Sequence, residues 1–194
     1  TIFRKEEKNK KITLVVFGLG CLTAPALLGM QILWDKYPNF NLINIIESKT
    51  ESYAVATILV LLLFATMEEI IKLFVVKTVD QKTLAITKIN DAIKYSIVSA
   101  LGFSFTENVY YLYEYWNNVS TNELFGMYIF RSIFTTSAHI FYSGIFGYYY
   151  GIGKFSIQIN EQKKIISGEK DRVGKWISKL FNLPLSEGFR QKLV

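Results

Sequence analysis

Residues 53–76 read YAVATILVLLLFATMEEIIKLFVV, and this stretch decides the class of the protein. A helix that crosses the hydrocarbon core of a bilayer needs about 20 consecutive, mostly apolar residues. The apolar run continues from Ile70 to Val76, after the two glutamates, so the charges lie inside the span. The alternative, a helix whose cytoplasmic end begins at Glu68 among lipid headgroups, fits that continuation less well. The stretch therefore predicts a membrane-spanning helix that carries ionisable groups.

Three other apolar stretches are long enough to cross a bilayer, at residues 12–34, 92–113 and 124–150. Pro25 lies inside the first and is expected to kink it, because proline has no amide hydrogen to donate to the preceding turn. The sequence therefore predicts an all-α fold, a polytopic transmembrane helix bundle of about four spans. These spans would form one domain over residues 1–151.

The charge distribution agrees with a membrane location. The chain has 22 Lys and Arg against 16 Asp and Glu, a net charge of +6, and the basic residues flank the apolar runs. They form no stripe interleaved with aromatic side chains, so the lipid bilayer is the expected partner and no nucleic acid is expected. Connecting segments alternate between rich and poor in Lys and Arg, which predicts that both termini are cytoplasmic. The single cysteine, Cys21, excludes an internal disulfide and a cysteine-based metal cage.

Residues 152–194 are polar, rich in lysine and too short in apolar run to span a bilayer. Apolar side chains recur there at helical spacing, at Val173, Trp176, Ile177, Leu180 and Phe181. Such a basic amphipathic helix suits the anionic cytoplasmic surface of a membrane. It is equally suited to a solvated helix that packs on a further part of the same protein.

The second span carries a carboxylate pair and a lysine. An ionisable group at the centre of a bilayer costs about 3 kcal/mol or more, so each one needs a physical reason. Glu68 and Lys72 are one helical turn apart, in the order that favours an ion pair. The lysine is expected to neutralise one carboxylate and leave the other, at Glu68 or Glu69, free for chemistry.

Polar residues also form helical stripes in the third and fourth spans. Residues four apart share a face of a helix. The third span has such a stripe at Ser99, Phe103, Glu107 and Tyr111, with Ser104 and Asn108 beside it. The fourth span has one at Arg131, Thr135, His139 and Ser143, with Thr136 beside it. His139 is the only histidine of the chain.

These polar positions can meet inside the bundle. At about 1.5 Å per residue, Glu68 and Glu69 lie roughly 10 Å from the cytoplasmic end of their helix, and Glu107 and His139 roughly 15–20 Å. Carboxylates and an imidazole that face one another are suitable ligands for a metal bound by nitrogen and oxygen. The alternatives are polar contacts that hold helices together, or an Arg131–glutamate pair with His139 as a hydrogen-bonding neighbour.

Three motifs occur in order on successive apolar helices: Glu68-Glu69-x-x-Lys72, Phe103-x-x-x-Glu107-Asn108, and Phe130-Arg131-x-x-Phe134-Thr135-Thr136-x-x-His139. Together they resemble the PrsW family, membrane proteases of bacteria and archaea related to the CAAX-prenyl-protease and bacteriocin-processing superfamily. The resemblance covers about residues 55–151. It implies an intramembrane endopeptidase in the plasma membrane of a prokaryote, dependent on glutamate and on a divalent metal, with zinc as the expected ion. The implied substrate is a membrane protein such as an anti-sigma factor, cut at site 1 in a stress response.

The resemblance also implies roles for single residues. Glu68 and Glu69 would be paired catalytic glutamates, one activating water, with Glu107 and His139 as their partners. Metal ligands would be Glu69, Glu107 and His139. Asn108 would orient a ligand or stabilise an oxyanion, and Arg131 would hold a carboxylate. Supporting positions would be Lys72, Phe103, Asn108, Arg131 and Thr135.

The chain departs from the family pattern in two places. Glu107 stands where the related CAAX-type proteases have histidine, which leaves the ligand set open. Family members have further helices, one with another histidine, so the chain is expected to be a fragment, a truncated form or a divergent short member. A transporter or proton-relay protein and a non-catalytic membrane scaffold remain alternative functions, because a chain of carboxylates and imidazole serves ion passage equally well.

Overall fold

The computed structural model describes residues 2–116, 118–156, 158–159, 176 and 179–180. All regular elements in these residues are helical, which confirms the all-α prediction. The elements are α1 (Ile2–Lys36), η1 (Pro38–Phe40), α2 (Leu42–Lys49), α3 (Tyr53–Thr83), α4 (Ile89–Tyr115), α5 (Thr121–Phe130), η2 (Arg131–Thr135) and α6 (Thr136–Lys154).

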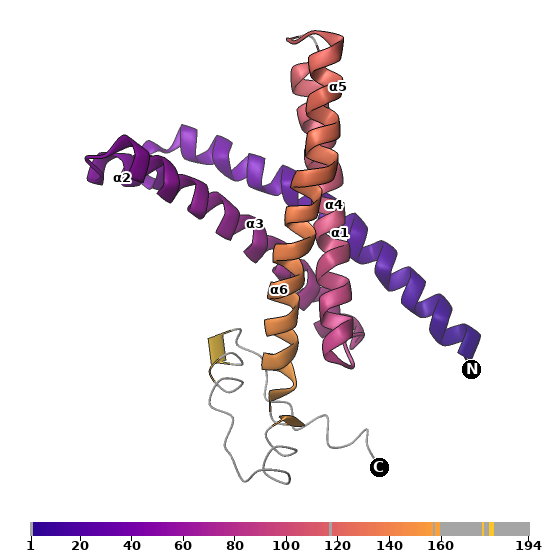
Figure 1. Ribbon diagram of the computed structural model, residues 1–194. Helices are drawn as coiled ribbons and strands as arrows, with labels where there is room; N and C mark the ends of the chain where they lie inside the picture. The colour runs from indigo at the N-terminus through magenta and orange to yellow at the C-terminus, as the bar shows by residue number, and fades with distance from the viewer. Residues whose placement is uncertain (1, 117, 157, 160–175, 177–178, 181–194) are drawn as a thin grey trace.

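Helix α4 lies at the centre of the arrangement. It runs beside α6 along the long axis of the molecule. Helix α5 is nearly in line with α6 and lies beside the upper half of α4 (Figure 1). Helices α1 and α3 cross this pair at a steep angle and diverge from α5 (Figure 1). The main core cluster lies where the four long helices meet, with Val16 of α1, Val76 of α3, Ala92 of α4 and Tyr150 of α6 as members.

Glycine allows the closest of these crossings. A Cβ at Gly102 would collide with the backbone of α1, at the carbonyl of Phe17 and the amide nitrogen of Cys21. A Cβ at Gly147 would lie 2.6 Å from Ser96 Oγ of α4. Small residues at both crossings let the backbones approach, as is common between membrane helices. Gly147 thus serves packing within the chain, between α6 and α4.

Within the residues that the structure describes, two helices are long and apolar enough to span a membrane, over Asn9–Lys36 and Tyr53–Thr83. They contain the first two predicted spans, and many large apolar side chains of α3 face outward. The other two predicted spans correspond to α4 and to α5–η2–α6, which are not among these two. Helix α4 carries Glu107 and Asn108 within its apolar run, and a π-helical turn begins at Arg131 within the fourth stretch.

The connection between α1 and α3 contains two short helices. It contains η1 and α2, and the side chain of Asn41 caps α2 by accepting the amide of Ile43 at 2.9 Å. Helix α3 extends past Val76 to Thr83 and ends at Leu84, whose φ of 52° lies in the left-handed region. Most of the predicted amphipathic helix at 173–181 lies outside the described residues.

An ion pair between Asp80 and Lys154 ties the end of α3 to the end of α6. Asp80 of α3 is buried and accepts a hydrogen bond from Tyr150 Oη at 3.1 Å and one from Lys154 Nζ at 2.5 Å. Its other oxygen accepts the amide of Ile86 at 3.1 Å, in the α3–α4 connection. These contacts fix the α3–α4 turn against the end of α6, and so hold α3 in register with the helices that carry the polar site.

Candidate active site

Helix α3 contributes a buried carboxylate with two partners. Glu69 accepts hydrogen bonds from Lys72 Nζ and from Ser143 Oγ of α6, each at 2.5 Å. The lysine is one turn further along α3 and is almost fully buried. It pairs with Glu69, so of the two carboxylates whose pairing the sequence left open, Glu69 is the one that the lysine neutralises. Both glutamates lie within about 60° of Lys72 around the helix, and both approach α6: Glu69 accepts from Ser143, whereas Glu68 approaches His139.

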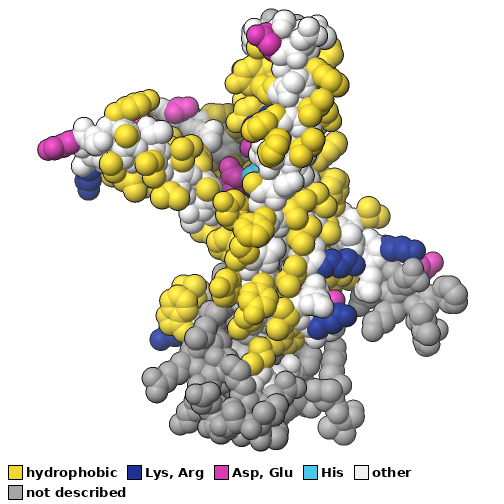
Figure 2. Space-filling model, viewed as in Figure 1, with side chains coloured by type: hydrophobic (Ala, Val, Ile, Leu, Met, Phe, Trp, Pro, Cys, Tyr) yellow, Lys and Arg dark blue, Asp and Glu magenta, His cyan; other side chains and the backbone are white. Residues whose placement is uncertain are grey.

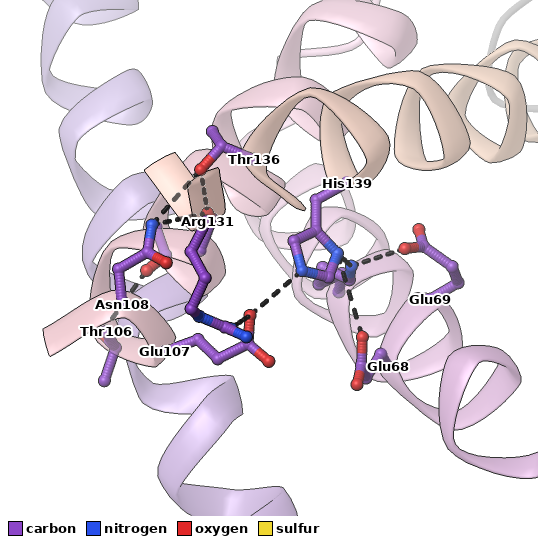
Figure 3. Close-up of polar contacts among 11 residues, drawn as sticks. Glu68, Glu69, Thr106, Glu107, Asn108, Arg131, Thr136 and His139 are labelled. Carbon is purple, nitrogen blue, oxygen red and sulfur yellow. Dashed lines mark hydrogen bonds and ion pairs between the residues drawn. The ribbon is translucent and has the colours of Figure 1, made fainter. Parts of the chain in front are cut away.

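His139 of α6 lies between two helices, with each ring nitrogen facing a charged group. Nδ1 is 3.1 Å from Lys72 Nζ, and Nε2 is 3.2 Å from Glu107 Oε2 of α4 (Figure 3). Glu68 approaches the Nδ1 side, with Oε2 at 3.8 Å. The structure therefore brings together all four residues that the sequence analysis names as catalytic.

Glu107 also pairs with Arg131, whose Nη2 lies 3.0 Å from Oε2. The guanidinium stacks over the ring of Tyr111, 3.6 Å from its centroid. Glu107 and Tyr111 belong to the predicted polar stripe of α4, so this stripe contacts Arg131, the first residue of η2. Both the Arg131–glutamate pair and the catalytic grouping of the sequence analysis are present, and His139 joins them.

Phe103 forms the apolar floor of the site. Its ring is 2% exposed, meets the His139 ring edge-on at a centroid distance of 5.0 Å, and lies 4.5 Å from Lys72 Nζ. A cation above an aromatic face gains electrostatic energy, and more so where water is excluded. Phe103 therefore holds both the ammonium and the imidazole in place.

A π-helical turn decides which threonine faces α4. In η2 the amide of Thr136 bonds to the carbonyl of Arg131, five residues earlier. One extra residue in the turn shifts the faces of the helix. Thr136, rather than the predicted Thr135, therefore contacts α4, with Oγ1 2.6 Å from Ser104 Oγ and 3.3 Å from Asn108 Nδ2.

Asn108 belongs to this neighbouring polar cluster and not to the carboxylate centre. Its amide nitrogen is directed to Ser104 Oγ at 3.4 Å and to Thr136 (Figure 3). Among the described residues, no side-chain contact links Thr135 to the carboxylate centre. The sequence analysis did not include Ser104, Thr136 and Ser143 among the site residues, although the helical stripes contain all three.

Exposure differs sharply among the charged residues. The side chains of Glu68 and Glu107 are 23% and 19% exposed, whereas those of Glu69 and Lys72 are 8% and 1% exposed. Figure 2 shows acidic side chains and the histidine at the bottom of a hollow between the α3 and α5 arms. Among the described residues, no Lys or Arg lies within ion-pair distance of Glu68. Glu68 is therefore the carboxylate that is free to meet water.

Comparison with protein families bears directly on this arrangement. The model of the family described as PrsW family intramembrane metalloprotease matches residues 8–169, most of the chain. The chain belongs to the PrsW family. It is accordingly a membrane protein and a peptidase, and its substrate is a membrane protein met within or beside the lipid. Searches of curated proteins and of solved structures gave no match.

The PrsW description implies a divalent metal, which can be tested against the residues of the site. Within the described part of the chain, no group of three or more His, Cys, Asp or Glu side chains is placed to hold one. Glu107 contacts His139 directly, whereas Lys72 lies between Glu69 and the ring. Each of the two carboxylates is paired with a cation, Glu69 with Lys72 and Glu107 with Arg131. Both ring nitrogens are also engaged. The predicted ligand set does not fit a metal in this arrangement and stays a prediction.

Proposed function

We propose that this PrsW-family protein is a site-1-type endopeptidase that cuts a single-span membrane protein such as an anti-sigma factor. The observation that supports it most directly is Glu68, an accessible carboxylate without a basic partner among the described residues, beside an imidazole and above a closed ion pair. In this proposal α4 and α5–η2–α6 also cross the bilayer, giving four spans. The protein lies in the plasma membrane of a prokaryote with both termini in the cytoplasm.

Glu68 acts as the general base in this proposal. Its carboxylate takes a proton from water, the water oxygen bonds to the carbonyl carbon of the scissile amide, and the proton passes to the leaving nitrogen as the C–N bond breaks. A general base must reach the proton that it removes. Glu68 meets that condition better than Glu69, because Glu69 is buried and accepts two hydrogen bonds already.

Arg131 stabilises the negative charge that develops on the carbonyl oxygen. Its Nε–H is buried and has no hydrogen-bond acceptor in the described part of the chain, so in this proposal a substrate oxygen accepts from it once the donor is uncovered. Donors fixed in advance where charge develops are a large part of enzymatic rate enhancement. Asn108 is less suited to this role, because its amide is directed to Ser104 and Thr136. Glu107 orients Arg131 through their ion pair.

Zinc is the metal that we propose for the divalent ion implied by the family. It binds nitrogen and oxygen ligands of the kind present here. No step of the mechanism above is assigned to it, since the observed arrangement does not fit a metal. Elemental analysis of the purified protein tests the proposal: about one zinc per chain supports it, and a metal-free active protein refutes it.

The test of the function is co-expression of the full-length protein with a tagged single-span anti-sigma factor, followed by immunoblotting. Cleavage is expected with the wild type and lost with Glu68→Gln and His139→Ala, while both variants stay in the membrane. Lys82→Met, an exposed change on the same helix as Glu68, should cleave normally. Cleavage that survives in Glu68→Gln would refute the role of Glu68 as base.

A further inference from the structure

Arg131 is held from two directions. Its Nη2 lies 3.0 Å from Glu107 Oε2, and its Cζ lies 3.6 Å from the centroid of the Tyr111 ring. The second separation is that of van der Waals contact, so the cation lies directly over the aromatic face. Arginine is suited to such a contact because its guanidinium is planar and weakly hydrated. The Nε–H donor has no acceptor among the described residues, so both contacts leave it unused.

The ion pair alone does not set the direction of this donor. A single contact at Nη2 leaves the guanidinium able to turn about the line that joins it to the carboxylate of Glu107. Such a turn moves Nε–H without breaking the ion pair. An aromatic ring against the face of the guanidinium opposes the turn, because the plane could rotate only by pressing into the ring or by losing contact with it. The two contacts together therefore set both the place and the direction of the donor.

The Tyr111 ring is itself supported by its own helix. The ring of Tyr115, one turn further along α4, is nearly parallel to it, with an interplanar angle of 9° and a centroid distance of 6.2 Å. The Tyr110 ring meets it edge-on at 5.6 Å. Among the described residues, no hydrogen bond involves the Tyr111 hydroxyl. The ring, rather than the hydroxyl, is thus the part of Tyr111 that holds Arg131.

We propose that Tyr111 is a positioning residue for the reaction, which fixes the plane of the Arg131 guanidinium so that Nε–H is directed to the substrate carbonyl oxygen. This inference rests on the proposed role of Arg131. Donors that stabilise developing charge are most effective when their direction is set before the reaction. A second carboxylate could also hold the guanidinium, but it would accept from the N–H donors. An aromatic face attracts the cation and leaves Nε–H free for the substrate.

Cleavage kinetics of the purified full-length protein test this role, with the tagged single-span anti-sigma factor as substrate. Tyr111→Leu should lower kcat by about 10- to 100-fold, because a misdirected donor stabilises the developing charge less well. KM should stay within about threefold, since the lost interaction is made in the transition state. Tyr111→Phe retains the ring and should keep kcat within about threefold of the wild type. The control Tyr113→Leu, on the same helix and 80% exposed, should cleave normally.

A double-mutant cycle shows whether Tyr111 acts through Arg131. Arg131→Lys keeps the positive charge but removes the Nε donor, and should lower kcat by about 10²- to 10³-fold. Residues that act through one another have non-additive effects. Adding Tyr111→Leu to Arg131→Lys should therefore lower kcat no further. An equal additional loss in both backgrounds would assign Tyr111 to general packing and overturn the inference.

A spectroscopic measurement without substrate tests the contact itself. The chain has four arginines, so ¹⁵N-arginine labelling gives few Nε–Hε signals in detergent or nanodiscs, and the signal missing from Arg131→Lys is that of Arg131. Spectra are recorded at mildly acidic pH, where exchange with water is slow. The ring current shifts a proton above an aromatic face upfield. The Arg131 Hε signal should be upfield of the others in the wild type and in Tyr111→Phe, and should move toward them in Tyr111→Leu.

Two further results would overturn the inference: an Arg131 Hε signal at the same position in the wild type and Tyr111→Leu, or an unchanged kcat in Tyr111→Leu. A wild-type signal without an upfield shift would do so even if no variant folds. Failure of the proposed function looks different. If the wild type cleaves no candidate substrate while the spectra are as expected, the protease mechanism is refuted and the hold of Tyr111 on Arg131 stands.

Discussion

Removing the charge of Glu69 should lower the stability of the protein more than removing the charge of Glu68, although the two residues are adjacent. Glu69→Gln leaves the ammonium of Lys72, 1% exposed, without a counter-charge. Breaking a buried ion pair from one side costs about 3–5 kcal/mol, whereas replacing both partners with uncharged groups is often neutral. Since 1 kcal/mol shifts Tm by about 2–4 °C at this size, the expected fall is about 6–20 °C. Glu69→Gln/Lys72→Met should recover most of it.

Glu68→Gln should behave in the opposite way. Its side chain is 23% exposed and has no basic partner among the described residues. Its cost should stay at about 1 kcal/mol, because the side chain is only partly buried and no buried ion pair is broken, while cleavage is lost. The assay is thermal unfolding of detergent-purified protein followed by tryptophan fluorescence, beside the cleavage assay. The reasoning fails if Glu69→Gln melts with the wild type, or if Glu68→Gln destabilises as much as Glu69→Gln.

Three other variants test the architecture around the site. Gly102→Ala should lower the free energy of unfolding by about 1–3 kcal/mol, because the new Cβ would press on the backbone of α1. The control, Gly18→Ala, has open space at its Cβ and should be neutral or stabilising by up to about 1 kcal/mol. Equal Tm values for the two variants would contradict the close crossing of α1 and α4. Thr136→Val should lose the contacts to Ser104 and Asn108 and cost about 1–3 kcal/mol of stability. Thr135→Val should change Tm little. If Thr135→Val were the more destabilising of the two, the π-helical turn would not be present as described. Asp80→Asn should weaken the hydrogen bonds from Tyr150 and Lys154 and increase amide hydrogen exchange in the α3–α4 turn. Unchanged exchange in that turn would show that the Asp80–Lys154 ion pair does not hold it in place.

Much of the site could be predicted because helical spacing is a local property. An apolar run of sufficient length forms a helix in lipid, where every backbone polar group must find its partner within the segment. Residues four apart then share a face, so Glu107 with Phe103, and His139 with Ser143, could be assigned to stripes before any contact was known. The cost of burying charge indicated that these stripes meet.

The outcome for the paired carboxylates was not a local property. Spacing favoured an ion pair between Glu68 and Lys72, yet Lys72 pairs with Glu69. The choice depends on which side of α3 faces α4 and α6, where Ser99 Oγ donates to the Lys72 carbonyl and Ser143 Oγ donates to Glu69. A sequence pattern shows which residues share a face of a helix, but not which neighbouring helix that face contacts.

The sequence by itself therefore determined the class of the protein, the approximate positions of its long helices and the set of charged residues that meet, since each follows from apolar length, helical period and the cost of charge in lipid. Only the tertiary structure decided the division of roles. Packing buried Glu69 with Lys72 and left Glu68 accessible, and the extra residue in the η2 turn directed Thr136 to α4 in place of Thr135. Both depend on how neighbouring helices pack, a property that no single helix contains.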